Sequence, residues 1–365
     1  MAHEILFNPI EMGSQTFKNR IVMAPLTRLR AIEPGDVPSI WAAEYYAQRS
    51  GAGLIITEAT QVSFQAKGYA GAPGLHTQDQ KVAWKVITDA VHAKGGKIVV
   101  QLWHTGLVAH KSVQPDSQPP ISASDVKVKN RTSLRDSDGQ AIRVDVTPPR
   151  PATVQEIEQV IKDFAHATEL AREAGFDGVE IHGAHGYLLH QFWAQHTNQR
   201  SDEYGGSRDN RARLMLAVID ACVQAWDAHH IGIRISPWGS FNGVDASYET
   251  EDNLWLIDQI NQRGLMYLHI SEPDWAGGKP YTDEFRQQIR DTFNHTIIAA
   301  GGYSVDKAER NIKAGYIDAV AFGRDYIATP DLAERIAADI PFNEQHPESF
   351  YGGGSAGYTD YPLMD

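Results

Sequence analysis

The chain has 365 residues, which is enough for one large barrel or two ordinary domains. Its hydrophobic content of 42% and charged content of 22% are typical of a globular protein. A formal net charge of −13 argues against nucleic acid and anionic membranes as partners, because either would require a basic face.

Eight short β-rich runs follow one another along the chain, and most are continuously apolar, as expected of strands buried on both faces. They cover residues 20–24, 53–59, 97–103, 178–182, 231–236, 266–271, 296–301 and 319–323. Helical patterns lie between them, at residues 40–49, 80–94, 154–174, 208–228, 251–263, 283–292, 305–314 and 332–339. This alternation predicts an α/β protein with a (β/α)8 TIM barrel as a single domain over residues 1–365, and a doubly wound sheet is the alternative.

One connection is too long for an ordinary barrel loop. Residues 105–152, between the third strand and the third helix, are rich in proline, serine and charge. We expect them to form an inserted capping subdomain over the barrel mouth. Residues 137–139 (SDG) predict a hairpin turn within it, and residues 1–19 are expected to cover the barrel floor.

The cellular compartment is expected to be the cytoplasm. Cys222 is the only cysteine, so an internal disulfide is impossible. The sequence also shows no signal-peptide pattern and no apolar run long enough to span a membrane.

The end of the fourth predicted strand carries the most distinctive chemistry. His182 is the last side chain of this strand, and His185 and Tyr187 follow about one turn later. Two neutral donors for a carbonyl oxygen beside a phenol suit polarisation and protonation of an unsaturated carbonyl. A purely structural histidine is one alternative. A metal held by His-x-x-His is another, but no convincing third ligand accompanies the pair, so we predict no metal.

The loops after the seventh and eighth strands predict a phosphate site. In TIM barrels these loops commonly bind phosphate. Here they contain Gly301 and Gly302, then Gly323 and Arg324, which offer backbone N–H groups and a cation. Turn glycines with a surface arginine are the alternative interpretation.

Three other strand ends suit a flat heteroaromatic ring joined to that phosphate. Thr27, Gln101 and Arg234 can line its polar edge, and Arg234 would stabilise it when reduced and anionic. Flavin mononucleotide (FMN) meets both demands. The glycine-rich segment 352–357 fits G-x-G-x-x-G, but no helix can follow it, so it is not a dinucleotide-binding motif.

Several motifs, in order along almost the whole chain, resemble the old yellow enzyme family. They are residues 23–28 (MAPLTR), 101–106 (QLWHTG), 180–188 (EIHGAHGYL), 204–207 (YGGS), 271–278 (SEPDWAGG), 321–324 (AFGR) and 350–354 (FYGGG). Within this family the chain is most similar to the bacterial branch of N-ethylmaleimide reductase and pentaerythritol tetranitrate reductase. The resemblance implies a bound FMN and an NAD(P)H:flavin oxidoreductase for small molecules. Hydride from NADPH or NADH would pass through flavin N5 to the β-carbon of activated alkenes, such as enones and maleimides. Nitro compounds and nitrate esters would also be reduced, in a ping-pong mechanism that suits xenobiotic reduction.

The resemblance also implies individual roles. Tyr187 would be the proton donor, His182 and His185 would bind the substrate oxygen, and Thr27 would tune the flavin potential. The implied cofactor-binding residues are Ala24, Pro25, Leu26, Thr27, Ala59, Gln101, His182, Arg234, Gly301, Gly302, Gly323, Arg324 and Tyr351. The implied substrate-binding residues are Tyr69, Trp103, Arg131, Arg143, His182, His185, Tyr187, Trp275 and Tyr351.

The chain departs from the family in two places. Leu107 stands where relatives usually have arginine, and residues 193–196 (WAQH) replace a segment similar to Leu-Ser-Pro. Both departures bear on the shape of the pocket rim and on substrate preference.

Two other functions remain as alternatives. A phosphosugar isomerase or aldolase would need a lysine or acid at a strand end, for which Glu58 is the only acidic candidate. A non-catalytic flavin carrier or sensor is the other. The sequence leaves the physiological substrate and the choice of nicotinamide open, and it is compatible with a monomer or a weak dimer.

Overall fold

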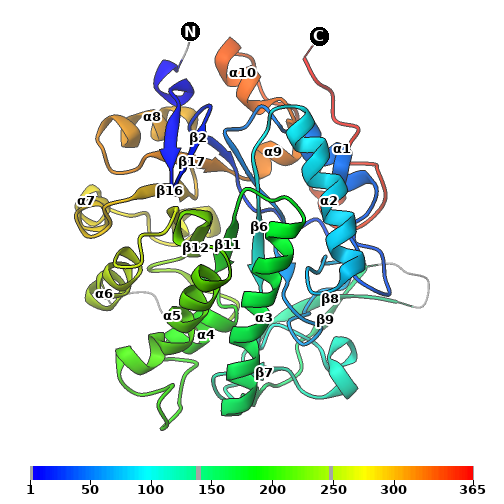
Figure 1. Ribbon diagram of the computed structural model, residues 1–365, viewed down its shortest axis with the longest axis vertical. Coiled ribbons are helices and arrows are strands. Elements are labelled where there is room, and N and C mark those ends of the chain that lie inside the picture. Colours follow the sequence, from blue (N-terminus) through cyan, green and yellow to red (C-terminus); the bar gives the residue numbers. More distant parts are fainter. Residues whose placement is uncertain (1–2, 137–140, 246–249, 365) are drawn as a thin grey trace.

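A closed parallel barrel forms the centre of the molecule in the computed structural model, which describes residues 3–136, 141–245 and 250–364 (Figure 1). Its strands are β3 (Ile21–Met23), β4 (Leu54–Ile56), β6 (Ile98–Trp103), β11 (Val179–His182), β12 (Ile231–Ile235), β15 (Tyr267–Ser271), β16 (Thr296–Ala300) and β17 (Ala319–Phe322). Each strand pairs in parallel with the next, and the pairing of β11 with β6 closes the ring. The eight predicted strands and the TIM barrel are therefore confirmed.

Helices surround the barrel. They are α1 (Trp41–Gln48), α2 (Gln78–Ala93), α3 (Val154–Glu173), α4 (Leu188–Trp193), α5 (Arg208–Ala225), α6 (Thr250–Asn261), α7 (Asp283–Thr292), α8 (Val305–Lys313), α9 (Arg324–Ala328) and α10 (Leu332–Ala338). The sequence did not predict α4 and α9. Both are short, and every residue of α4 is buried, so α4 lacks the one-sided apolar pattern that marks a surface helix.

Strand residues alternate between two apolar layers. Outward side chains such as Val100, Ile181 and Ile233 join the core between barrel and helices. Inward side chains such as Val99 and Ile298 form a second cluster inside the barrel. Strands buried on both faces need continuous apolar sequence, which is the pattern that identified them.

The N-terminal segment covers the barrel floor, as predicted. Strands β1 (Ile10–Met12) and β2 (Gln15–Phe17) form an antiparallel hairpin, and Ile10, Met12 and Phe17 pack onto the inner cluster. A capping box begins α3, because Thr153 and Glu156 exchange side-chain-to-backbone hydrogen bonds.

Residues 105–152 contain two short strand pairs. Strand β7 (Ile121–Ser122) pairs in parallel with β10 (Arg150–Pro151), and β8 (Arg131–Arg135) pairs antiparallel with β9 (Ala141–Asp145). The predicted turn at residues 137–139 lies outside the described residues. In Figure 1 both chain ends lie near the top, whereas the β8–β9 hairpin lies in the lower half.

Three short strands complete the fold. Strand β5 (Thr60–Gln61) pairs with the end of β6, and β13 (Ser240–Phe241) pairs with β14 (Val244–Asp245) in the loop after β12. Among the described residues, no helix is both long and apolar enough to cross a lipid bilayer.

Candidate active site

A tight turn after β11 brings the two histidines and the tyrosine together. His185 and Gly186 both adopt positive φ, at 56° and 73°. A Cβ on Gly186 would lie 2.2 Å from the carbonyl oxygen of Phe241, so this turn requires glycine. The chain then enters α4, and the ring of Tyr187 lies 5.0 Å from that of His182, centroid to centroid. The His182 and His185 rings are 5.4 Å apart.

Both histidines are neutral at physiological pH. Burial, and next the positive charge of Arg234, hold their pKa values well below the usual value of 6.5. The backbone N–H of Ala184 donates to His182 Nδ1 at 3.3 Å. The ring proton of neutral His182 is therefore on Nε2, where it can be donated to a ligand. His185 Nε2 lies 2.8 Å from the Ser271 hydroxyl.

Tyr187 lies in an aromatic group with Tyr69 and Trp103. Its hydroxyl is 3.4 Å from that of Tyr69, and its ring meets Trp103 edge-on at 4.9 Å. Tyr69 stacks on Trp103 at 5.4 Å. Burial raises the pKa of Tyr187 well above 10, so the phenol keeps its proton at neutral pH.

A cavity of about 360 Å³ opens beside this group. It is lined by Thr27, Leu29, Tyr69, Ser133, Arg143, Tyr187 and Tyr351. These residues come from distant parts of the chain: the loop after β3, the loop after β5, the β8–β9 hairpin, the turn after β11 and the C-terminal tail. Five of them were predicted from the sequence as site residues.

Gln101 and Arg234 lie on the inner face of the barrel, Arg234 level with His182 and Gln101 one layer below, level with Glu180. Both side chains are buried, and in the part of the chain that the structure describes Arg234 Nε has no hydrogen-bond partner. Arg234 pairs in register with His182 across β11 and β12. Ala59 packs with Trp103 nearby. A buried guanidinium with an unused donor is suited to a polar ligand edge.

The predicted phosphate loops lie side by side, because β16 pairs with β17 at Ala300 and Ala321. One predicted donor is already engaged, since the Gly302 N–H donates to Asp274 Oδ1 at 2.8 Å. Lys307 pairs with the same carboxylate at 2.8 Å. Gly323 and the exposed Arg324 begin α9, and residues 302–306 and Phe322 line a second cavity of about 690 Å³.

Comparison with known proteins decides the family. A sequence profile of the family described as NADH:flavin oxidoreductase / NADH oxidase matches residues 5–343. The putative 12-oxophytodienoate reductase 4 of Oryza sativa subsp. japonica is 44% identical over 365 residues, covering 99% of this chain and 93% of the relative. This chain belongs to the NADH:flavin oxidoreductase family. FMN is accordingly its cofactor.

Solved structures agree with this membership. Morphinone reductase in complex with tetrahydroNAD matches this flavin oxidoreductase with a TM-score of 0.94 and 42% identity, covering 99% of this chain and 98% of the other. The old yellow enzyme homologue from Zymomonas mobilis matches with a TM-score of 0.92 and 36% identity, covering 98% and 99%. The recognised resemblance to the old yellow enzyme family is confirmed, and the finer placement in the N-ethylmaleimide reductase branch stays a prediction.

Some of the remaining predicted site residues of the flavin oxidoreductase line the cavity, and others lie outside it. Arg143 lines it, whereas Arg131 is exposed, donates to the Arg143 carbonyl and lies 3.9 Å from Asp145. Trp275 is 42% exposed and stacks on Phe241, with its ring 5.8 Å from that of His185. Ala24, Pro25 and Leu26 form the start of the loop that leads to Thr27.

Sequence reasoning missed the loop that supports His185. Phe241 meets the His185 ring edge-on at 4.7 Å, and the Asn242 side chain donates to the His185 carbonyl oxygen at 2.8 Å. Ser271 ends β15 and holds His185 Nε2. The only sequence signal was position, since Ser271 is the last residue of a predicted strand.

The C-terminal tail is fixed by two buried arginines that sequence reasoning also missed. Arg28 Nε donates to the Phe350 carbonyl at 2.9 Å, and Arg30 Nε donates to the Gly354 carbonyl at 2.9 Å. The Gly352 N–H donates back to the Arg28 carbonyl. These bonds hold Tyr351 at the cavity.

Both departures from the family pattern lie in packed positions. Leu107 is fully buried, and its N–H donates to the side chain of Gln191. Trp193 stacks on Trp255, and Arg211 lies over its ring. Neither Leu107 nor Trp193 lines the cavity beside Tyr187.

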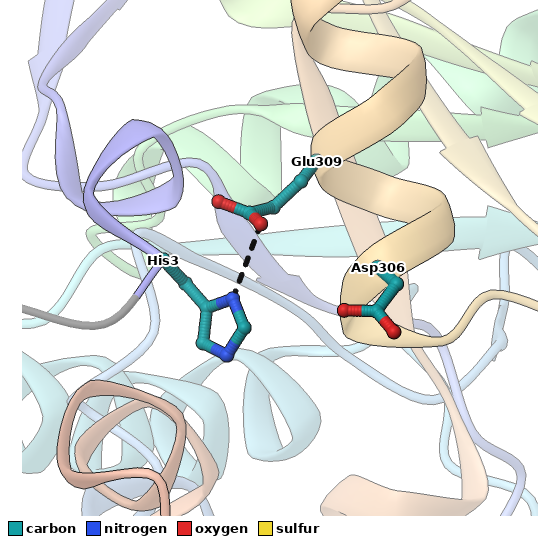
Figure 2. Close-up of side chains that lie close together, drawn as sticks. All are labelled: His3, Asp306 and Glu309. Atoms are coloured by element: carbon teal, nitrogen blue, oxygen red, sulfur yellow. Dashed lines mark ion pairs between the residues drawn. The ribbon is translucent and has the colours of Figure 1, made fainter.

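One group in the described part of the chain has metal-ligand chemistry. His3, Asp306 and Glu309 place ligand atoms within 4.8 Å of one another (Figure 2). His3 and Glu309 already form an ion pair at 3.2 Å, and Asp306 is exposed. A partly solvated ion pair accounts for this group.

Proposed function

We propose that this flavin oxidoreductase is an ene-reductase that uses NADPH or NADH to reduce activated alkenes, such as enones and maleimides, and also nitro compounds or nitrate esters. One observation carries the proposal. A pair of neutral histidines packs against a protonated tyrosine that lines a cavity, with buried polar groups of the barrel close by. This arrangement suits an unsaturated carbonyl that must be polarised and then protonated.

The barrel residues fit an FMN ring. Arg234 has an unused buried donor, and Gln101 can donate to or accept from an imide edge. Thr27 lies at the cavity, where its hydroxyl can meet the opposite edge of the ring. Gly301, Gly323 and Arg324 are proposed to hold the phosphate. When bound, FMN supplies two-electron transfer between the nicotinamide and the alkene.

The side chains of the protein then bind the substrate, deliver a proton and exclude water. His182 donates from Nε2 to the substrate oxygen, and His185 acts beside it after exchanging its bond with Ser271. Tyr187 delivers a proton to the α-carbon of the alkene. Tyr69, Trp103, Trp275 and Tyr351 exclude water around the substrate, and we propose that the β8–β9 hairpin caps the cavity through Ser133 and Arg143.

Glu58 cannot serve as the general base that a phosphosugar isomerase would need. Glu58 accepts hydrogen bonds from the backbone N–H groups of Arg28 and Leu29, at 2.9 and 3.1 Å. It therefore holds the loop after β3, and it does not line the cavity, where a general base would have to reach the substrate. The other alternative, a flavin carrier, is not favoured by membership of the NADH:flavin oxidoreductase family.

An anaerobic spectral titration tests the proposal. The purified protein should be yellow, lose its flavin absorbance on addition of NADPH or NADH, and regain it on addition of an enone such as 2-cyclohexenone. Bleaching without recovery by any alkene or nitro compound would favour the carrier. Failure to bind FMN at all would contradict the proposal.

The same preparation tests the remaining expectations about partners. We propose that the protein works as a monomer or weak dimer on small molecules, without nucleic acid. Sedimentation velocity over a range of protein concentrations should show mainly a species of 40.4 kDa.

A further inference from the structure

A carboxylate is buried inside the barrel, directly below the proposed ring site. Glu180 points inward from β11 and is completely buried. Its two oxygens accept hydrogen bonds from Gln101 Nε2 at 2.6 Å and from His269 Nδ1 at 2.8 Å. The mechanism proposed above does not use this carboxylate.

The surroundings of Glu180 keep it negative. Burial opposes its ionisation, but the interaction with His269, the charge of Arg234 and the hydrogen bond from Gln101 lower its pKa below the usual value. Burial lowers the pKa of His269, so this ring donates as a neutral group. Arg234, whose pKa burial lowers to about 10, is therefore the positive partner of Glu180.

The neighbouring strands leave room for the side chain of Glu180 inside the barrel. Glu180 lies level with Gln101 on β6 and with Gly232 on β12. A Cβ on Gly232 would lie 2.4 Å from the Tyr267 ring, so glycine is needed for that ring to enter the barrel. The barrel thus holds a negative charge in a closed layer beneath Arg234.

We propose that Glu180 sets the reduction potential of the bound FMN by offsetting the positive charge of Arg234 and by fixing the amide of Gln101. This inference rests on the proposed function, because it assumes that the ring lies over Gln101 and Arg234. A buried charge acts strongly over short distances, since little water screens it. Arg234 stabilises an electron-rich ring, and Glu180 weakens that effect.

The test is the midpoint potential of the flavin, measured by dye equilibration in the holoprotein. Glu180→Gln keeps the shape of the side chain and removes the charge. It should favour the reduced flavin by ten-fold or more, which is about 30 mV for a two-electron couple. Arg234→Gln should shift the potential in the opposite direction, and the double variant should lie between the two single variants.

The control is Asp177→Asn. Asp177 is a buried carboxylate at the opposite end of β6, where it accepts from the Ile98 N–H at 2.8 Å. Its replacement should leave the potential unchanged. Glu180→Gln alone leaves the charge of Arg234 unpaired, and this could prevent folding. The double variant has neither charge and then tests the inference in its place. Its potential should be higher than that of Arg234→Gln alone.

Two results would overturn the inference. An unchanged or lowered potential in Glu180→Gln, with FMN bound normally, would reject the role of Glu180 and leave the proposed function intact. A wild-type protein that does not bind FMN would reject the proposed function and this inference together. A merely structural role for Glu180 would weaken FMN binding in every variant without these opposite shifts.

Discussion

Tyr187 holds its proton because burial makes the phenolate unfavourable. Tyr187→Phe should therefore remove the proton source and leave the ring in place. Reduction of the flavin by NADPH should stay nearly unchanged, while oxidation by an enone should slow about 10²–10⁴-fold, the usual range for one general acid. Stopped-flow measurement of the two half-reactions separates these effects.

A matched control for Tyr187 is Tyr281→Phe, which removes another buried phenol, one that donates to the Pro237 carbonyl. It should leave both half-reactions unchanged. Equal losses in both half-reactions of Tyr187→Phe would identify Tyr187 as a packing residue instead.

The affinity of the histidine pair for a ligand should not change with pH in the mildly acidic range. Because the pKa of each ring is held well below 6.5, both rings stay neutral as the pH falls from about 8 to about 5.5. The affinity for a phenolic ligand, followed by its long-wavelength absorbance with the oxidised flavin, should stay flat over this range. His182→Ala should weaken it by about 1–3 kcal/mol. A ten-fold change in affinity centred near pH 6.5 would contradict the neutral state.

At the scale of elements, α3 begins directly after the inserted segment, and its start depends on Thr153 and Glu156. Thr153→Ala should reduce the free energy of unfolding by about 1 kcal/mol, because it removes a cap. Urea unfolding of the holoprotein at fixed FMN concentration measures this loss. Thr282 caps the start of α7. Thr282→Ala removes a cap of the same type, so its loss in free energy of unfolding can be compared with that of Thr153→Ala.

The stability contributed by the start of α3 should depend on pH. The hydrogen bonds from Arg150 lower the pKa of Glu156 to about 2, against 4.5 in the unfolded chain. Because this pKa is depressed, the stabilisation is present above pH 4.5 and is lost as the pH falls towards 2. Between about pH 6 and pH 3, Glu156→Gln should lose less stability than the wild type, since glutamine keeps the capping box but has no charge. Equal losses would show that the ion pair contributes nothing.

At the scale of the whole molecule, we propose that the cavity beside Tyr187 serves both substrates. Its volume of about 360 Å³ is near the lower end of ordinary ligand pockets, and the β8–β9 hairpin borders it. We therefore expect the nicotinamide and the alkene to bind in turn. Initial-rate plots at several fixed NADPH concentrations should give parallel lines, as in a ping-pong reaction. Lines that intersect would indicate that both substrates bind together.

The barrel was predictable from the sequence, and so was a candidate site that shares most of its residues with the cavity beside Tyr187. Parallel strands buried on both faces are mostly apolar along their whole length, so β4 and β17 were visible as unbroken runs. Catalytic side chains of such barrels gather at strand ends, and this rule predicts a site that includes Thr27, Gln101, His182 and Arg234. Local chemistry fixes the start of α3, where Thr153 and Glu156 form a capping box.

Which of these groups face one another depends on the three-dimensional fold. Glu180 and His269 are 89 residues apart, and the closed barrel brings them to hydrogen-bonding distance. The same holds for Ser271 beside His185 and for Asp274, which engages the Gly302 N–H. Sequence patterns report the burial and period of a segment, whereas these contacts depend on the register between strands and on the path of loops. Burial then set the neutral state of the histidines, because the cost of removing water depends on the whole surrounding fold. The neighbours that the fold brings to Glu180 keep it charged in spite of burial.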